Sequence, residues 1–360
     1  MSERSERTIW LSSAAGKGRR GHDGRGEGGG EQATVPSAEF RSYYGRPIIK
    51  APVWRREIPS YLFTGGLAAG AALLAAAADL TGRPALRRAG RLTALGAIGV
   101  SGYFLINDLG RPARFHHMLR VAKPTSPMSM GTWVVAGFGS AAGVAAVSEF
   151  ASRLPGRDAL GLARQGLPLA GRVAGFAAAG LAPALATYTA VLLADTAVPS
   201  WHEAYAHLPH VFAGSALASG AGVGLIAAPL AESGPARRLA VAGAALDLAG
   251  SHRLESRLGL LSEPYRVGRA GKLLRAGRIL SVTGMLGALL GRRSRLASAL
   301  SGIALLAASV ATRFGIYEGG VASARDPKYT VTPQRQRREQ AAVRVDHQER
   351  HVGSTSSSAP

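Results

Sequence analysis

Long apolar blocks alternate with short polar connections between residues 58 and 314 of the chain. The blocks are rich in Ala, Leu, Gly and Val, and most charged residues lie in the gaps between them. A helix of about 20 apolar residues crosses the roughly 30 Å hydrocarbon core of a bilayer. The pattern therefore predicts eight membrane-spanning helices, at approximately 58–78, 92–108, 130–150, 173–194, 209–230, 236–250, 276–291 and 296–314.

The polar segment from Asp195 to His207 separates the first four blocks from the last four, which favours two four-helix bundles. The sixth and seventh blocks have only about 15 residues, so we expect them to be tilted differently or partly re-entrant. Pro183 and Pro229 lie within or at the end of a block, where proline kinks or ends a helix. The expected fold class is all-α integral membrane, with about eight transmembrane helices.

Polar tails flank the apolar region. We assign residues 1–50 to a Gly-, Arg- and Glu-rich tail, residues 51–325 to the transmembrane domain and residues 326–360 to a polar C-terminal tail. Both tails have few large apolar side chains and are expected to be disordered. Residues 1–40 contain no apolar run of the length that a signal peptide needs, so we expect none there. Arg residues flank both membrane faces, so the positive-inside rule gives conflicting indications of orientation.

Small residues recur four positions apart within several blocks: Gly66 and Gly70, Gly139 and Gly143, Ser215 and Ser219, and Gly287 and Gly291. Such pairs place small side chains on one helix face. Transmembrane helices associate through faces of this kind, because lipid offers no hydrophobic contrast. The pattern predicts close packing between helices.

Composition excludes several kinds of site. The 360 residues include no cysteine, which removes thiolate-held iron–sulfur clusters and zinc from this chain. The nine His lie mostly in loops and tails, so we also expect no bound haem. The net charge of +21 fits attraction to anionic lipids of the bilayer. Eight apolar spans and no recognised reader motif argue against nucleic-acid binding.

Polar side chains able to carry chemistry gather at the predicted face shared by both tails. They come from the start of span one and from the connections after spans two and four, and include Trp54, Glu57, Tyr61, Asp108, Arg111, Arg114, His116, His117, Tyr188, Asp195, Trp201, His202, Glu203, His207 and His210. A quinone site needs such a set beside an apolar slot. Quinone oxygens need hydrogen-bond donors, and quinone redox needs a carboxylate or His that moves protons.

Simpler interpretations remain open for several of these residues. The hydroxyls of Tyr61 and Tyr188 would serve an interhelical hydrogen bond as well as a ligand. Trp54 and Trp201 also fit an interfacial belt of aromatic anchors. Asp247 lies in the apolar run VAGAALDLAG, where an ionisable group is expensive and often functional, although its short span also fits a water-filled edge.

Three segments carry a family resemblance: YYGRPIIKAPVWRREIPSYLFTGGLAAGAALL (Tyr43–Leu74), LINDLGRPARFHHMLRVAKPTSPMSMGTW (Leu105–Trp133) and TYTAVLLADTAVPSWHEAYAHLPHVFAGSALASGAG (Thr187–Gly222). They resemble the start of the first span, the connection between spans two and three, and the fourth and fifth spans of the NrfD/polysulfide reductase membrane-subunit family. The remaining spans match this family only in character.

The resemblance implies a multi-pass anchor in the cytoplasmic membrane that works with a four-cluster iron–sulfur subunit and a molybdopterin catalytic subunit. It also implies that menaquinone or ubiquinone binds near the face of the iron–sulfur partner, with electrons arriving at the connection from Asp108 to Arg114. The family's quinone-contacting positions fall on Glu57, Tyr61 and Tyr188. Some members have Asn and His at the first two of these positions, so the hydrogen-bonding scheme here is open.

The expected function is a membrane subunit of a multi-subunit oxidoreductase that binds quinone and exchanges electrons with its iron–sulfur partner. Tyr61 and Tyr188 would donate to the quinone oxygens, and Glu57 or Asp108 would move protons. Three further candidates for the cofactor site share this face: Arg111, Arg114 and His210. The two arginines would also fit contacts with lipid headgroups.

Two alternatives belong to other classes of protein. A secondary transporter or ion-translocating protein would use Asp108 and Asp247 along a substrate path, but the chain shows no inverted repeat of broken helices. A purely structural anchor would have lost its quinone pocket. Neither the direction of quinone redox nor the substrate of the catalytic partner follows from the sequence.

Overall fold

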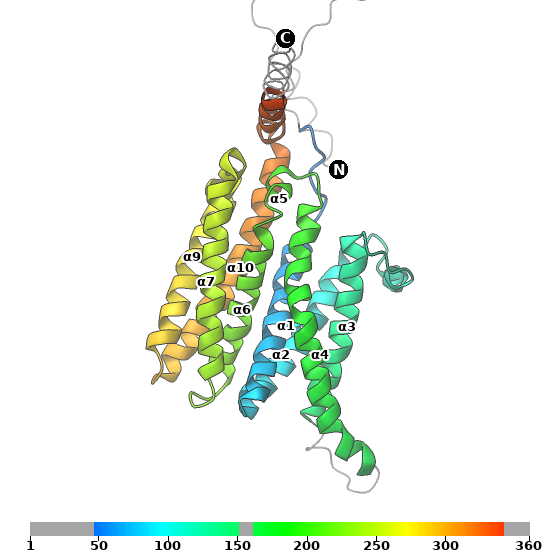
Figure 1. The fold of residues 1–360 in the computed structure, drawn as a ribbon, viewed down its shortest axis with the longest axis vertical. Coiled ribbons are helices and arrows are strands. Elements are labelled where there is room, and N and C mark those ends of the chain that lie inside the picture. Colours follow the sequence, from blue (N-terminus) through cyan, green and yellow to red (C-terminus); the bar gives the residue numbers. More distant parts are fainter. Residues whose placement is uncertain (1–46, 151–160, 342–360) are drawn as a thin grey trace, which may run out of the picture. The chain divides into compact units, whose positions relative to one another are not determined.

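The structure is a computed structural model that describes residues 47–150 and 161–341. Its elements, seen in Figure 1, are α1 (Glu57–Leu80), α2 (Pro84–Asn107), η1 (Pro112–Leu119), α3 (Pro127–Ser148), α4 (Gly161–Ala194), α5 (Pro199–His202), α6 (Leu208–Ala227), α7 (Gly234–Arg257), η3 (Gly259–Ser262), α8 (Glu263–Arg266), α9 (Gly268–Leu290) and α10 (Arg295–Arg325). The predicted all-α fold is confirmed for these ranges. Most of the N-terminal tail lies outside them.

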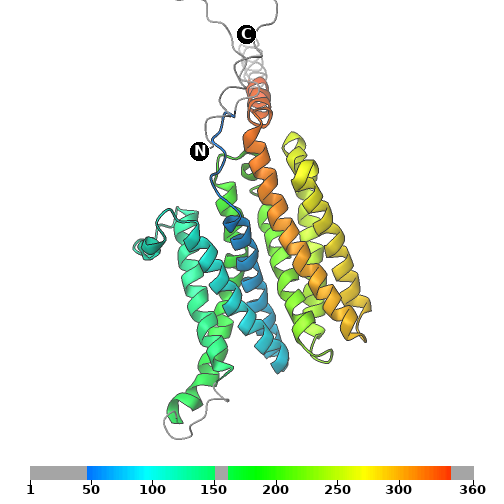
Figure 2. The ribbon, with the colours of Figure 1, turned by 180° about the vertical axis from the view of Figure 1, so that it is seen from behind.

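Eight long helices form two four-helix bundles. In the first bundle, α1 and α3 each pack against α2 and α4; in the second, α6 and α9 each pack against α7 and α10. Helices α1 and α6 join the bundles. Figure 2 shows the same two groups from behind, with α10 beside α9. The predicted pair of bundles is therefore confirmed.

Two helices are longer than the sequence pattern indicates. Helix α7 has 24 residues and α9 has 23, so both exceed the roughly 20 residues that a span needs. The predicted length of about 15 residues for the sixth and seventh segments is therefore too short. Charged residues obscure the ends of these helices in the sequence. In the structure, Arg278 of α9 pairs with Glu255 of α7 at 3.1 Å, so these charges meet each other instead of lipid.

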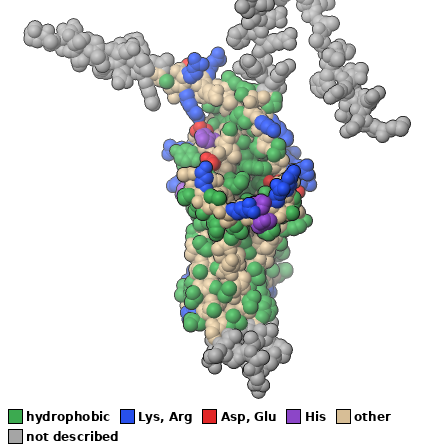
Figure 3. All heavy atoms as spheres, turned by 90° about the vertical axis from the view of Figure 1, so that its right-hand side faces the viewer, with side chains coloured by type: hydrophobic (Ala, Val, Ile, Leu, Met, Phe, Trp, Pro, Cys, Tyr) green, Lys and Arg blue, Asp and Glu red, His purple; other side chains and the backbone are tan. Residues whose placement is uncertain are grey.

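The surface fits a position in a bilayer. Seven described helices are long and apolar enough to cross a membrane: α1, α2, α3, α4, α6, α9 and α10. Figure 3 shows Lys, Arg and His side chains gathered on the upper half of one face, above a band of mostly hydrophobic side chains and backbone. Such a band is what the hydrocarbon core requires. The chain is a multi-pass membrane protein.

Small residues allow the central helices of the two bundles to approach closely. A Cβ atom on Gly70 of α1 would overlap the carbonyl group of Ala216 on α6, and one on Gly220 would overlap the backbone of Gly70. The predicted packing role of Gly70 is confirmed. By contrast, Cβ atoms on Gly139 and Gly143 of α3 would meet no described atom within 4 Å, so this pair does not mediate a helix contact within the described ranges.

A group of ion pairs joins α1, α2 and α3 at the end of the first bundle that lies away from η1. Glu149 accepts hydrogen bonds from Arg87 at 2.8 Å and from Arg91 at 2.9 Å, and Arg87 also contacts Asp79 at 3.1 Å. The side chains of Arg91 and Glu149 are 7% and 3% exposed. We call these four residues the paired cluster.

The C-terminal tail begins with a helix. Residues 328–341 are helical, although the sequence predicts disorder from Thr330 onward. Lys328 Nζ lies 2.9 Å from Glu263 Oε1, an ion pair that ties this helical segment to α8. Residues 342–360 lie outside the described ranges.

Candidate functional site

A cavity of about 80 Å³ lies at the end of the first bundle that carries η1. Its walls come from the starts of α1 and α3, the ends of α2 and α4, and η1. Apolar side chains dominate the lining, and the polar side chains are Tyr61, Asp108, Thr132 and Tyr188. A mostly apolar lining with a few polar groups is typical of small-molecule sites. We call this space the η1 cavity.

Two tyrosines face each other across the η1 cavity. The ring centroids of Tyr61 and Tyr188 are 6.4 Å apart at an interplanar angle of 71°, an edge-to-face contact. The Tyr188 ring lies against Gly131 of α3, where a Cβ atom would overlap it. The Tyr188 hydroxyl is buried and has no hydrogen-bond partner among the described residues. Because an unsatisfied buried donor costs about 1–3 kcal/mol, this hydroxyl is available to a ligand.

Two carboxylates lie where the η1 cavity meets the membrane face. Asp108 directly follows α2 and lines the cavity, and Glu57 is the first residue of α1. Burial raises the pKa of Asp108 above its ordinary value, the negative charge of Glu57 raises it further, and Arg55 opposes both effects. Glu57 Oε2 is buried without a hydrogen-bond partner in the described part of the chain. A raised pKa brings proton exchange by Asp108 closer to neutral pH.

An aromatic stack connects the η1 cavity to the second bundle. The ring of Trp54, which lines the cavity, stacks on Trp201 at 5.9 Å, and Trp201 lies 5.8 Å from Tyr317 of α10. Trp201 Nε1 donates to the Ile316 carbonyl at 2.9 Å, and the Tyr317 hydroxyl donates to the Trp54 carbonyl. Because Trp201 is fully buried, it is not an interfacial anchor. The stack fixes the cavity wall against α10.

Four predicted site residues do not line the η1 cavity: Glu57, Arg111, Arg114 and His210. Arg111 and Arg114 are exposed at the start of η1, at the membrane face outside the cavity. His210 is exposed in the first turn of α6, with Nδ1 3.1 Å from the Ala206 carbonyl oxygen. The structure therefore brings the two tyrosines and Asp108 together, with Glu57 beside them. The arginines and His210 are left for contacts with lipid, solvent or a partner.

Several lining residues were not singled out from the sequence: Met118, Met128, Gly131 and Thr132. Their role depends on how η1 folds over the start of α3, and an eight-residue 3₁₀ helix leaves no long periodic pattern. Gly131 lies within the segment that carries the family resemblance, but its contact with Tyr188 depends on how α3 and α4 cross.

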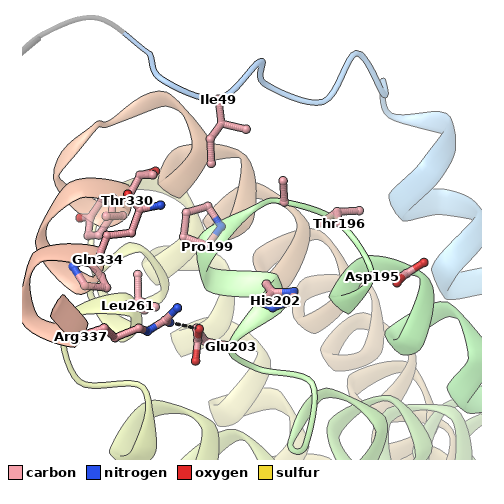
Figure 4. Close-up of a pocket in the computed structure, with 13 residues that line it drawn as sticks. Ile49, Asp195, Thr196, Pro199, His202, Glu203, Leu261, Thr330, Gln334 and Arg337 are labelled. Carbon is pink, nitrogen blue, oxygen red and sulfur yellow. Dashed lines mark hydrogen bonds and ion pairs between the residues drawn. The ribbon is translucent and has the colours of Figure 1, made fainter. Parts of the chain in front are cut away.

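A second, more open cavity of about 330 Å³ lies between α5 and the C-terminal helical segment (Figure 4). Asp195, His202 and Glu203 line one side, and Gln334 and Arg337 line the other, with an ion pair between Glu203 and Arg337. These polar residues form a surface separate from the η1 cavity. The prediction that Asp195, His202 and Glu203 belong to the same polar set as Tyr61 and Tyr188 therefore does not hold for the cavity lining. Within residues 47–150 and 161–341, no group of three or more His, Cys, Asp or Glu side chains is placed to hold a metal ion.

Comparison with known proteins gives one match. The family model described as polysulphide reductase, NrfD, matches residues 49–245, which is more than half of the chain. The matched range includes every residue that lines the η1 cavity. No curated protein matches the chain.

Proposed function

Because the chain belongs to the NrfD family of membrane subunits of polysulfide reductase-like complexes, we propose that the η1 cavity binds the head group of menaquinone or ubiquinone. The observation that carries this proposal is the buried Tyr188 hydroxyl, a donor without a partner among the described residues, in a mostly apolar cavity. A quinone carbonyl oxygen is an acceptor that suits this donor.

The side chains of the η1 cavity have distinct roles in this proposal. Tyr188 donates its O–H to one carbonyl oxygen, and Tyr61 supplies a second hydroxyl group in the cavity lining. Asp108 holds a proton on its carboxyl group and moves it to or from the bound head group, and its raised pKa supports that role. When bound, the quinone supplies a carrier of two electrons and two protons.

The η1 cavity must widen to admit a head group. Its volume of about 80 Å³ is well below the roughly 300–1,000 Å³ that is typical of ligand pockets. Met118 of η1 and Met128 at the start of α3 supply part of the wall, and methionine side chains adapt readily to a new neighbour. Met128 is 55% exposed, so it has room to move. Binding therefore involves a shift of the wall formed by η1 and the start of α3.

The electron-transfer partners follow from the same proposal. A four-cluster iron–sulfur subunit docks on the face formed by η1 and exchanges electrons with the bound quinone, and a molybdopterin subunit completes the complex. The exposed guanidinium groups of Arg111 and Arg114 on this face support docking of an acidic surface. The direction of electron flow depends on the chemistry of the catalytic subunit.

Substitution of Tyr188 by Phe tests the proposal. Tyr188→Phe keeps the ring against Gly131 but removes the hydroxyl. We expect the apparent affinity of the intact complex for quinone to fall by about 2- to 12-fold, because a neutral hydrogen bond contributes about 0.5–1.5 kcal/mol net. Steady-state turnover in membranes at varied quinone concentration measures this change.

A matched control distinguishes the cavity from other tyrosines. Tyr205, which is 68% exposed, should tolerate Tyr205→Phe without any change in quinone affinity. If Tyr188→Phe leaves both turnover and quinone affinity unchanged, Tyr188 is not a quinone ligand. Solute transport by the chain alone in liposomes would then favour the transporter alternative.

A further inference from the structure

Two charged side chains that do not line the η1 cavity lie in the core of the second bundle. Asp247 is near the middle of the 24-residue helix α7 and is 4% exposed; Arg313 of α10 is fully buried. No ion pair joins them or links either to another charge in the part of the chain that the structure describes. A buried charge without a partner costs several kcal/mol, and at membrane depth it often marks a functional site.

The hydrogen bonds of both groups are incomplete. Asp247 Oδ2 accepts a bond from Ser281 Oγ at 3.3 Å, whereas Oδ1 has no partner among the described residues. Arg313 Nη2 donates to the Phe212 carbonyl at 2.8 Å, and its guanidinium lies 3.9 Å from the centre of the Phe212 ring. The Nε and Nη1 atoms of Arg313 have no described partner. The two opposite charges act on each other through space but make no direct contact.

Asp247 lines a small cavity. Its volume is about 10 Å³, which is close to the space that one water molecule occupies. Its polar lining comes from Asp247, Ser251, Glu255, Arg278 and Thr312. The three α7 residues of this set are four positions apart, so they share one helix face. A single water here would have polar partners, and Ser251 lies between Asp247 and Glu255 on this helix face.

Glu255 connects the small cavity to one membrane face. Glu255 is 14% exposed and lies 3.1 Å from Arg278 and 3.9 Å from Arg266, an exposed residue at the end of α8. This is the face that carries η1, because α7 and α2 both end there. In the other direction, the fully buried side chains of Leu74, Leu225 and Leu305 form an apolar layer.

We infer that Asp247 is a proton-binding site in the second bundle that exchanges its proton with water at the η1 face through Glu255. A proton from water passes to the Glu255 carboxylate, then through the Ser251 hydroxyl and the cavity water to Asp247 Oδ1, and release reverses these steps. The charged groups that face this route from neighbouring helices are Arg313 on α10, Arg278 on α9 and Arg266 on α8, and α6 presents the backbone of Gly214. The apolar layer makes the route one-sided.

Infrared difference spectroscopy of the full chain in liposomes tests this inference directly. Across a pH titration, we expect a band from a protonated carboxyl group that Asp247→Asn removes. Glu255→Gln should keep the band but slow its hydrogen–deuterium exchange on the order of 100-fold, the contribution typical of a positioned proton carrier. The control Glu318→Gln, at a partly exposed position on α10, should change neither property.

Persistence of the titrating band in Asp247→Asn would overturn the inference. An unchanged rate of hydrogen–deuterium exchange in both Glu255→Gln and Ser251→Ala would also overturn the inference. Ser251→Ala removes no charge, so it remains a valid test if a charge variant does not fold. The measurement needs no quinone. Its failure is therefore separate from failure of the quinone proposal, which Tyr188→Phe tests.

Discussion

The paired cluster of the first bundle and the buried charges of the second bundle differ in both partners and depth. Glu149 lies at the end of α3 and has two guanidinium partners, at 2.8 and 2.9 Å. Asp247 lies near the middle of α7 and accepts one hydrogen bond, from a hydroxyl at 3.3 Å. Among the described residues, Arg313 donates one hydrogen bond, to a carbonyl group, and its guanidinium lies over an aromatic ring. Both carboxylates are almost fully buried, so burial alone does not explain the difference.

The comparison separates charges that hold helices together from charges that are available for chemistry. When a buried ion has its full set of partners, loss of one partner leaves the other uncompensated, and the helices lose a connection. When a buried ion lacks partners, its charged form is already costly, and a proton can remove that cost. We therefore expect neutral substitutions to destabilise the fold much more at the paired cluster than at Asp247.

The largest effect is expected at the paired cluster. Glu149→Gln leaves Arg91, which is 7% exposed, without its carboxylate. We expect the free energy of unfolding to fall by about 3–5 kcal/mol, as for other broken buried ion pairs. Denaturant unfolding of the purified protein in detergent measures the change. Glu318→Gln on α10 serves as the control and should stay within about 0.5 kcal/mol of the original protein.

A smaller effect is expected in the second bundle. Asp247→Asn removes a carboxylate that forms no direct ion pair among the described residues, so the substitution breaks no contact between charges, although Arg313 loses a nearby opposite charge. We expect the free energy of unfolding to change by less than about 1 kcal/mol, in the same unfolding measurement. A loss as large as that of Glu149→Gln would show that Asp247 stabilises the fold through its charge, and the contrast between the two bundles would then fail.

The fold was largely predictable because membrane spans leave a strong signal. Each of the eight helices overlaps a predicted apolar block, and the bundles divide where the polar segment between α4 and α6 interrupts them. The ends of α7 and α9 were not predictable in this way. Charges there satisfy each other across helices, as Glu255 and Arg278 do, and a hydropathy pattern counts them as solvent-exposed.

The candidate site was predictable in part. Residues from three distant segments meet because the ends of α2 and α4 and the start of α1 share one face, and this follows from the number of spans. The position of each side chain within that face does not follow. The position of the Tyr188 ring depends on glycine at position 131, where any side chain would overlap the ring. His210 is exposed outside the η1 cavity. Such contacts depend on helix crossing, which a single sequence does not specify.

The smallest expected effect concerns Asp108 in the η1 cavity, an incompletely paired carboxylate like Asp247 but close to the surface. The negative charge of Glu57 helps to raise the pKa of Asp108, and the positive charge of Arg55 lowers it. Glu57→Gln removes the repulsion, so Asp108 should lose its proton at lower pH. The midpoint of the pH profile of quinone-linked turnover should then move to lower pH. Arg55→Gln should move the midpoint to higher pH, and both shifts should shrink as salt screens these partly exposed charges. Shifts of the same sign in the two variants would mean that Asp108 does not set this profile.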